Sequence, residues 1–153
     1  MCNYEKATIC KNGHPINIHG QIAETYCSIC GAENISQCPT CNSDIHGWGK
    51  KWVVGRRYTV PKYCYFCGNP YPWTQQSLEA AKELILEDES LSELEKDNLS
   101  NSLPDIITET PKTSLAATRF KKALRSAGNF TADALRQFVI DFGCELAVKL
   151  LNQ

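Results

Sequence analysis

The spacing of hydrophobic residues changes along the chain, from alternation with polar residues in the first half to a helical period in the second. Ile16, Ile18 and Ile22 alternate with polar residues around a turn at Gly20, which predicts a β-hairpin. Between residues 42 and 63, tryptophan, valine and tyrosine favour strands, while glycine and proline interrupt them. The first half is therefore predicted to contain two hairpins.

The second half begins with two predicted helices. Thr74 is a good N-cap for a first helix, whose apolar residues recur at helical spacing as far as Ile85. Ser92 and Glu95 have the spacing of a capping box, which predicts the start of a second, short helix. Because the residue before a proline avoids the helical region, we expect this second helix to end before Pro104.

Two more helices are predicted to follow. Pro111 suits the first position of a third helix, which should stop at Gly128, and Thr131 should cap a fourth that runs to the end of the sequence. The apolar residues of this last segment form a broad stripe: Leu135, Phe138, Val139, Phe142, Leu146 and Leu150. A stripe of this width is expected to be buried, either against the neighbouring helices or in contact with a second copy or a partner protein.

Charge divides the chain in the same place as the hydrophobic pattern. The 153 residues carry a net charge of -1, which argues against a protein dedicated to nucleic acids or membrane surfaces but leaves local patches open. Residues 1–73 hold seven Lys/Arg against four Asp/Glu, whereas residues 74–153 hold nine against thirteen. The acidic run within residues 79–109 is expected to be a solvated face. We therefore predict two domains, residues 1–73 and residues 74–153, the second a helical region of about four helices.

The chain has nine cysteines, six of which form Cys-x-x-Cys pairs in the first domain. A residue that readily adopts positive φ follows each pair, namely Gly31, Asn42 and Gly68, as expected for a turn in which two thiolates face one metal ion. Cys10 and His14, which precede these pairs, supply a fourth pair of candidate ligands. The predicted metal ligands are, in order, Cys10 and His14, Cys27 and Cys30, Cys38 and Cys41, and Cys64 and Cys67.

Eight ligands suffice for two four-coordinate sites, but their pairing is open. A sequential arrangement joins the first two pairs into a site of three cysteines and one histidine and the last two into a site of four cysteines. We favour it because a predicted hairpin lies within each site. A cross-braced arrangement would use the same eight residues. The soft ligands favour two zinc ions, although the four-cysteine site could also hold iron. Both sites would be closed, which indicates a structural role rather than catalysis.

The remaining cysteines and histidines are expected to have ordinary roles. Cys2 lies near a terminus and Cys144 in an apolar helical pattern, where it should act as a small core residue. His19 and His46 are expected to be solvent-exposed or structural. Residues 1–30 contain no apolar run of the length that a signal peptide needs, which favours metal-bound thiolates over disulfides and predicts a cytoplasmic protein without a transmembrane segment.

A cluster of cations and aromatic residues in the second predicted hairpin is a candidate nucleic-acid contact. Cations beside aromatic rings suit phosphate contact and base stacking, above all on single strands. The alternative is that the cations are simply the solvent face of the hairpin. The candidate residues are Lys50, Lys51, Trp52, Arg56, Arg57 and Tyr58, with Trp48 beside them.

Five segments of the sequence resemble a family of uncharacterised bacterial proteins with an N-terminal double zinc ribbon. These segments are ICKNGH, YCSICG, CPTCN with DIHGW, YCYFCGNPYPWT and LPDIITETPKTSLAATRFKKAL. The resemblance implies a cytosolic bacterial protein and supports the eight metal ligands named above, but it implies no known activity. His46 stands where the resemblance leads us to expect a basic residue, which matters only if this region binds phosphate.

The sequence thus predicts a small α+β protein, with a double zinc ribbon of β-hairpins and zinc knuckles followed by an α-helical region. No convergent catalytic set remains once the metal ligands are assigned, so the predicted function is a non-enzymatic adaptor that binds a protein partner or associates with itself. The alternatives are a nucleic-acid-binding regulator that uses residues 48–58 and, less favoured, an enzyme with a labile knuckle thiolate.

Overall fold

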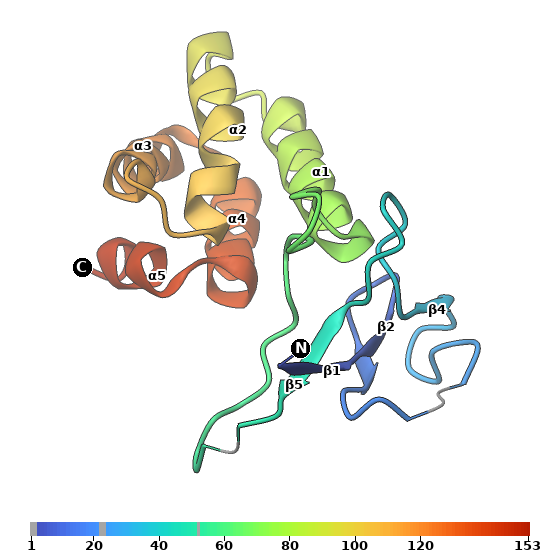
Figure 1. The fold of residues 1–153 in the computed structure, drawn as a ribbon. Helices are drawn as coiled ribbons and strands as arrows, with labels where there is room; N and C mark the ends of the chain where they lie inside the picture. Colours follow the sequence, from blue (N-terminus) through green and yellow to red (C-terminus); the bar gives the residue numbers. More distant parts are fainter. Residues whose placement is uncertain (1–2, 22–23, 52) are drawn as a thin grey trace. The chain divides into compact units, whose positions relative to one another are not determined.

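Short strands fill the first half of the protein and helices fill the second. The computed structural model describes residues 3–21, 24–51 and 53–153. Within these residues five strands precede five helices, so the predicted α+β class is confirmed. In Figure 1 the strands lie in the blue to cyan part of the chain and the helices in the green to red part. The chain divides into two compact units, residues 1–77 (the N-terminal unit) and residues 78–153 (the C-terminal unit). The division falls inside helix α1 (Pro72–Glu87).

The N-terminal unit contains two small antiparallel sheets. Strand β1 (Tyr4–Lys6) pairs with β5 (His46–Gly49), and β2 (Thr8–Cys10) lies between β3 (Pro15–Asn17) and β4 (Asn34–Ile35). The three residues of β2 are buried, as expected for the central strand of the larger sheet. The first candidate ligand, at the end of β2, therefore projects from the best-protected strand of the unit.

The first hairpin forms earlier in the chain than predicted. The prediction placed its turn at Gly20, but the hairpin is β2–β3, and the turn between these strands is the Cys10–His14 loop. The Cys10 N–H donates to the His14 carbonyl at 3.0 Å, and the Gly13 N–H donates to the Cys10 carbonyl at 2.8 Å. The loop that carries the ligands thus closes the hairpin itself. Of the residues used for the prediction, Ile22 lies outside the described part of the chain.

The prediction of a second hairpin within residues 42–63 is wrong. Strand β5 pairs with β1 instead, and the described residues from 50 to 71 contain only an isolated bridge between Tyr63 and Pro70. Gly47 explains the choice of partner, because a Cβ there would lie 2.5 Å from the Ile18 carbonyl oxygen and 2.9 Å from that of Glu5. Only glycine lets β5 approach these two segments so closely.

The core of the N-terminal unit combines aliphatic, aromatic and cysteine side chains. The Tyr71 and Trp73 rings stack with centroids 4.8 Å apart, and the Trp73 indole N–H donates to the Pro61 carbonyl at 2.9 Å. This indole therefore links the irregular segment 53–61 to the core. The buried members are Ala7, Ile9, Cys38, Ile45, Cys64, Tyr71 and Trp73.

Helix α1 begins two residues before the predicted N-cap. Thr74 lies in its first turn, and its hydroxyl donates to the Lys62 carbonyl at 2.7 Å instead of capping the helix. Proline at position 72 suits this start, because the first helical residue needs no intrahelical N–H bond. Thr74, the predicted cap, thus links helix α1 to the segment that precedes it by a hydrogen bond.

Helices α2 (Glu93–Ile107) and α3 (Thr113–Ser126) pack against each other in the C-terminal unit. The predicted capping box is confirmed: the Ser92 hydroxyl accepts from the Glu95 N–H, and the Glu95 carboxylate accepts from the Ser92 N–H. The predicted end before Pro104 is wrong, since α2 continues for three more residues beyond it. Leu103, Ile106 and Ile107 are buried there, and their burial offsets the missing proline N–H.

The last predicted helix is two helices, α4 (Asn129–Phe142) and α5 (Glu145–Leu151). At the break Gly143 leaves the helical conformation, and the Cys144 N–H donates to the Ile106 carbonyl at the end of α2, at 2.8 Å. This bond to α2 replaces the intrahelical bond of the Cys144 N–H, so α4 and α5 are separate helices. Cys144 packs against the core as predicted. Among the described helices, none is long and apolar enough to cross a membrane.

Asp88 ties the α1–α2 loop to the start of α4. Its Oδ1 accepts from the N–H groups of Ser90 at 2.7 Å and Leu91 at 3.2 Å, and its Oδ2 accepts from the Gly128 N–H at 3.0 Å. The pKa of the Asp88 carboxyl is lowered, chiefly by the Thr131 hydroxyl and further by these N–H groups. Thr131, the predicted cap of α4, is thus a buried residue inside that helix.

Candidate metal centres

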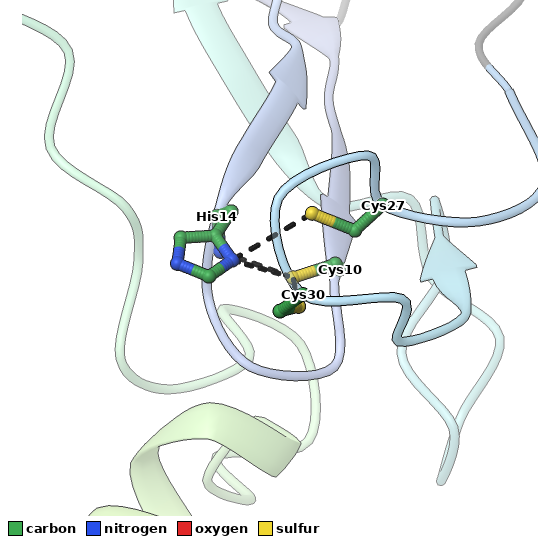
Figure 2. A group of neighbouring side chains, drawn as sticks. All are labelled: Cys10, His14, Cys27 and Cys30. Carbon is green, nitrogen blue, oxygen red and sulfur yellow. Dashed lines mark hydrogen bonds between the residues drawn. The ribbon is translucent and has the colours of Figure 1, made fainter.

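Four side chains converge at the turn of the β2–β3 hairpin. The ligand atoms of Cys10, His14, Cys27 and Cys30 all lie within 4.8 Å of one another, and Figure 2 shows them pointing toward one point. The Cys10 sulfur lies 3.3 Å from His14 Nδ1 and 3.7 Å from the Cys30 sulfur, and the Cys27 sulfur lies 3.7 Å from His14 Nδ1.

These separations suit a tetrahedral zinc ion. With Zn–S bonds of about 2.3 Å and Zn–N bonds of about 2.0 Å, a tetrahedral angle separates two sulfurs by about 3.8 Å and a sulfur from a nitrogen by about 3.5 Å. The observed distances of 3.3 to 3.7 Å lie close to both values. The first cluster therefore has the composition and the size of a zinc site with three thiolates and one imidazole.

The second cluster contains only cysteines. Cys38, Cys41, Cys64 and Cys67 also place their sulfurs within 4.8 Å of one another. Cys38 lies 3.8 Å from Cys67 and Cys41 lies 3.6 Å from Cys64, again near the edge of a zinc–thiolate tetrahedron. The eight ligands are thus grouped sequentially, and the cross-braced arrangement is not the one that the chain adopts.

One local turn positions all three Cys-x-x-Cys pairs. In each, the first cysteine N–H donates to a carbonyl five residues later, and the residue after the second cysteine donates its N–H back to the first cysteine carbonyl. That residue has positive φ in every case, as the sequence predicted: Gly31 (74°), Asn42 (60°) and Gly68 (74°). The bonds are Cys27 to Ala32 and Gly31 to Cys27, Cys38 to Ser43 and Asn42 to Cys38, and Cys64 to Asn69 and Gly68 to Cys64, all at 2.8 or 2.9 Å.

Hydrogen bonds to two of the sulfurs favour the thiolate, the form that binds metal. The Ala32 N–H, together with the Asn12 side-chain amide at 3.4 Å, lowers the pKa of Cys30 to about 6. The Ser43 hydroxyl lies 3.2 Å from the Cys41 sulfur and lowers its pKa to about 6. Each cluster therefore contains a thiol that loses its proton readily when a metal binds.

Trp73 contacts the loop of the first cluster, and the sequence did not reveal this contact. Gly13, in the Cys10–His14 loop, has φ of 91°, and a Cβ at this position would lie 3.0 Å from Trp73 Cβ and 3.2 Å from Trp73 Cγ. Trp73 belongs to the same buried cluster as Cys38 and Cys64 of the second site. The glycine of the NGH segment and the tryptophan of the PWT segment are therefore in contact.

Four of the six candidate nucleic-acid residues lie along a cavity of about 270 Å³ beside β5. Lys51, Arg56, Arg57 and Tyr58 line it together with Trp48. Of the other candidates, Lys50 lies outside the lining of this cavity and Trp52 lies outside the described residues.

The two histidines outside the clusters have structural contacts. His46 is stacked between Tyr4, at 4.2 Å between centroids, and Tyr65, at 3.9 Å, and burial lowers its pKa. His19 lies 3.1 Å from a Glu5 carboxylate oxygen. Neither lies in a metal-ligand cluster among the described residues, which agrees with the structural or exposed roles predicted for them.

The fold and the two clusters define a class: a small α+β protein with one cluster of three cysteines and a histidine and one of four cysteines, both compatible with zinc, followed by helices. A family model described as an uncharacterised protein conserved in bacteria (DUF2321) matches residues 3–151, so the chain belongs to this family. The resemblance found in the sequence is confirmed. No curated protein and no solved structure matches the chain.

Proposed function

We propose that the protein is a non-enzymatic adaptor whose N-terminal unit is folded by two zinc ions and whose C-terminal unit binds a partner protein. The observation that carries the proposal is the composition of the clusters. Each brings four protein ligands to one point, at distances that suit one tetrahedral ion. A zinc ion with four protein ligands has no place for water or substrate, so it acts in structure rather than in catalysis.

The zinc ions would dominate the stability of the N-terminal unit. The buried apolar core of this unit is small, and all of its described strands except β5 are only two or three residues long. A structural zinc ion contributes on the order of 10 to 16 kcal/mol of binding free energy, which exceeds the stability of most small domains. A surface held by two such ions stays rigid without a large core, which suits recognition.

That surface carries exposed aromatic residues. Tyr65 and Phe66 lie between the ligands Cys64 and Cys67, and they are 57% and 70% exposed. Tyr65 stacks on His46, so the knuckle of the second cluster and strand β5 share one aromatic surface. Exposed rings held by a rigid backbone are typical of binding surfaces.

The C-terminal unit offers a second surface, although most of the predicted stripe is covered by its own neighbours. Leu135 and Val139 are buried in the core, but Ile140 is 61% exposed beside a groove of about 350 Å³. The apolar residues that line the groove are Leu124, Val139, Ile140, Val148 and Leu151, and the cations are Lys121, Arg125 and Arg136. This lining suits a protein segment with apolar side chains flanked by acidic ones.

Capture from a host lysate, with the zinc-loaded full-length chain as bait and nuclease present, tests the adaptor function. Ile140→Glu places a negative charge in the groove, and Leu94→Glu makes the same change at a residue that is 71% exposed on α2, away from the groove. We expect the same protein to be captured by the wild type and by Leu94→Glu but not by Ile140→Glu. Equal capture by both variants would exclude the groove as the binding surface.

The non-enzymatic part of the proposal has its own test, because a reactive knuckle thiolate is the alternative. Thiols held by a closed zinc site are expected to resist alkylation under native conditions and to react once the zinc has been removed. Rapid alkylation of Cys30, the exposed ligand, with zinc still bound would favour an enzyme or a redox protein.

A further inference from the structure

We propose that the cavity beside β5 binds single-stranded nucleic acid, with one base inside it and the flanking phosphates on Lys51, Arg56 and Arg57. The inference rests on the proposed function, because the cavity exists only when the zinc-bound unit is folded. It adds a nucleic-acid site to the N-terminal unit of the adaptor.

The charges around the cavity are all of one sign. Lys51, Arg56 and Arg57 line it, and none of the described residues that line it is acidic. In the described part of the chain no carboxylate pairs with these three cations. The nearby acid Asp44 is already occupied, since Lys6 lies 2.9 Å from it. The three cations are therefore available to an anionic ligand.

Aromatic rings provide the second element of the site. Trp48 and Tyr58 line the cavity together with Tyr4. The Tyr58 hydroxyl donates to the His46 carbonyl at 2.8 Å, and burial raises its pKa to about 12, so this bond persists at neutral pH. Tyr58 thus holds the cationic segment 53–61 against β5. Aromatic rings beside cations are the combination with which proteins stack bases of single strands.

The volume and the lining of the cavity favour a single base. Its volume of about 270 Å³ is just below the range of about 300 to 1,000 Å³ that drug-sized ligands occupy. Gly47 and Gly49 in β5 form part of the lining without adding side chains. In a duplex the flat faces of the bases are stacked on one another, so only an unpaired base can enter such a cavity.

An acidic peptide is the competing anionic ligand. It would satisfy the three cations, but it would leave the Trp48 and Tyr58 rings without a flat partner, whereas each nucleotide supplies one phosphate and one ring. The combination of cations and rings therefore favours nucleic acid. Binding of the protein to a glutamate peptide of equal charge is the comparison that decides between the two.

The test measures fluorescence anisotropy of labelled oligo(dT) and oligo(U), each about 15 nucleotides long to span one site, with the zinc-loaded full-length chain. Each phosphate contact on a single strand contributes about 0.7 to the slope of log K against log salt, so three contacts predict a slope of about -2. Replacing all three cations, as Lys51→Ala, Arg56→Ala and Arg57→Ala, should remove that slope and weaken binding about hundredfold at about 0.1 M salt. Trp48→Leu should weaken binding about tenfold through lost stacking.

A matched control removes the same charge from the C-terminal unit. Lys82, Lys112 and Arg119 are exposed and do not line the cavity, so their triple alanine variant should bind the oligonucleotides within about twofold of the wild type. Zinc is counted in every variant, because a cation variant that keeps its metal has kept the unit folded. This control separates a local site from the effect of net charge.

Three outcomes would overturn the proposal: equal losses in the two triple variants, equal binding of the glutamate peptide, or equal binding of duplex DNA. None of these three outcomes refutes the adaptor function, provided that Ile140→Glu still fails to capture the protein that the wild type captures. Conversely, a chain without bound zinc would refute the adaptor proposal whatever the oligonucleotides do.

Discussion

Gly13→Ala tests the contact between the loop of the first cluster and Trp73. A Cβ at this position would lie 3.0 Å from Trp73 Cβ and 3.2 Å from Cγ, atoms that a rotation about χ2 of the indole cannot remove. Trp73 is buried and its indole N–H is bound to the Pro61 carbonyl, so the ring has little freedom to withdraw. We expect the loop itself to be displaced.

The expected loss of stability in Gly13→Ala has two parts. An alanine at the positive φ of Gly13 (91°) costs about 1 to 2 kcal/mol, and overpacking against a fixed side chain costs about 1 to 3 kcal/mol. Gly31 provides the matched control, because it also has positive φ (74°) and follows a ligand of the same site, but nothing lies within 4 Å of its added Cβ. Gly31→Ala should therefore show only the cost of an alanine at positive φ.

The assay is denaturant unfolding of the full-length chain at a fixed concentration of free zinc, followed by tryptophan fluorescence. All three tryptophans, at positions 48, 52 and 73, belong to the N-terminal unit, so the signal reports on this unit alone. We expect Gly13→Ala to lower the free energy of unfolding by about 1 to 3 kcal/mol more than Gly31→Ala does. Two variants that differ by less than about 0.5 kcal/mol would refute the role given to Trp73.

Four further substitutions test the fold of the two units, each by the change in the free energy of unfolding. Asp88→Asn should destabilise the C-terminal unit by about 1 to 3 kcal/mol at about pH 7. The pKa of Asp88 is lower in the folded state, so its carboxylate stabilises the folded C-terminal unit fully at pH values above the unfolded pKa of about 3.9. This stabilisation is lost as the pH falls toward the folded pKa. A difference in unfolding free energy between Asp88→Asn and the wild type that persists at lower pH would refute this linkage. Gly47→Ala, whose Cβ would meet backbone oxygens, should cost about 3 kcal/mol or more, whereas Gly49→Ala, whose nearest neighbour is 3.8 Å away, should cost under about 1 kcal/mol; equal costs would contradict the account. Pro104→Ala restores an N–H to α2 and should stabilise the C-terminal unit by up to about 3 kcal/mol, and an unchanged or lower stability would argue against the cost assigned to the missing N–H.

The ligand clusters could be predicted from the sequence because their information is local. A Cys-x-x-Cys pair followed by Gly31, Asn42 or Gly68 specifies its own turn, and the structure contains that turn three times. The sequential pairing also followed from chain order, even though neither of the two hairpins used to argue for it forms where it was predicted. Its physical basis is the short distance along the chain between Cys10 and Cys30, and between Cys38 and Cys67.

Strand pairing could not be predicted, because it depends on contacts between distant segments. The apolar residues of segment 48–60 suggested a hairpin, but β5 pairs with β1, which lies near the start of the chain. The deciding feature is the close approach of β5 to neighbouring backbone at Gly47. Strand propensities alone indicate only that a glycine interrupts a strand. The aromatic residues Trp48 and Tyr58 of that segment lie around the cavity instead of forming cross-strand pairs.

The helix boundaries differ from the prediction for similar reasons. At Pro104 the burial of Ile106 and Ile107 outweighs a local rule about proline, and at Cys144 a hydrogen bond from another helix outweighs a continuous apolar stripe. Asp88 is a third position where a tertiary contact decides the structure. Its place in an acidic run of the sequence did not indicate that its carboxylate accepts a hydrogen bond from the N–H of residue 128. Local chemistry could be predicted here, whereas tertiary partners could not.

The two proposed zinc sites are tested most directly by counting zinc in the purified full-length chain by native mass spectrometry and then removing it with a strong chelator. Two zinc ions per chain are expected, one for each cluster. On their removal, the tryptophan emission of the N-terminal unit should shift to that of exposed indole, while the helical circular dichroism of the C-terminal unit, which has its own core, should remain. Fewer than two ions per chain, or tryptophan emission that is unchanged after the metal has been removed, would contradict the proposal of two structural zinc sites.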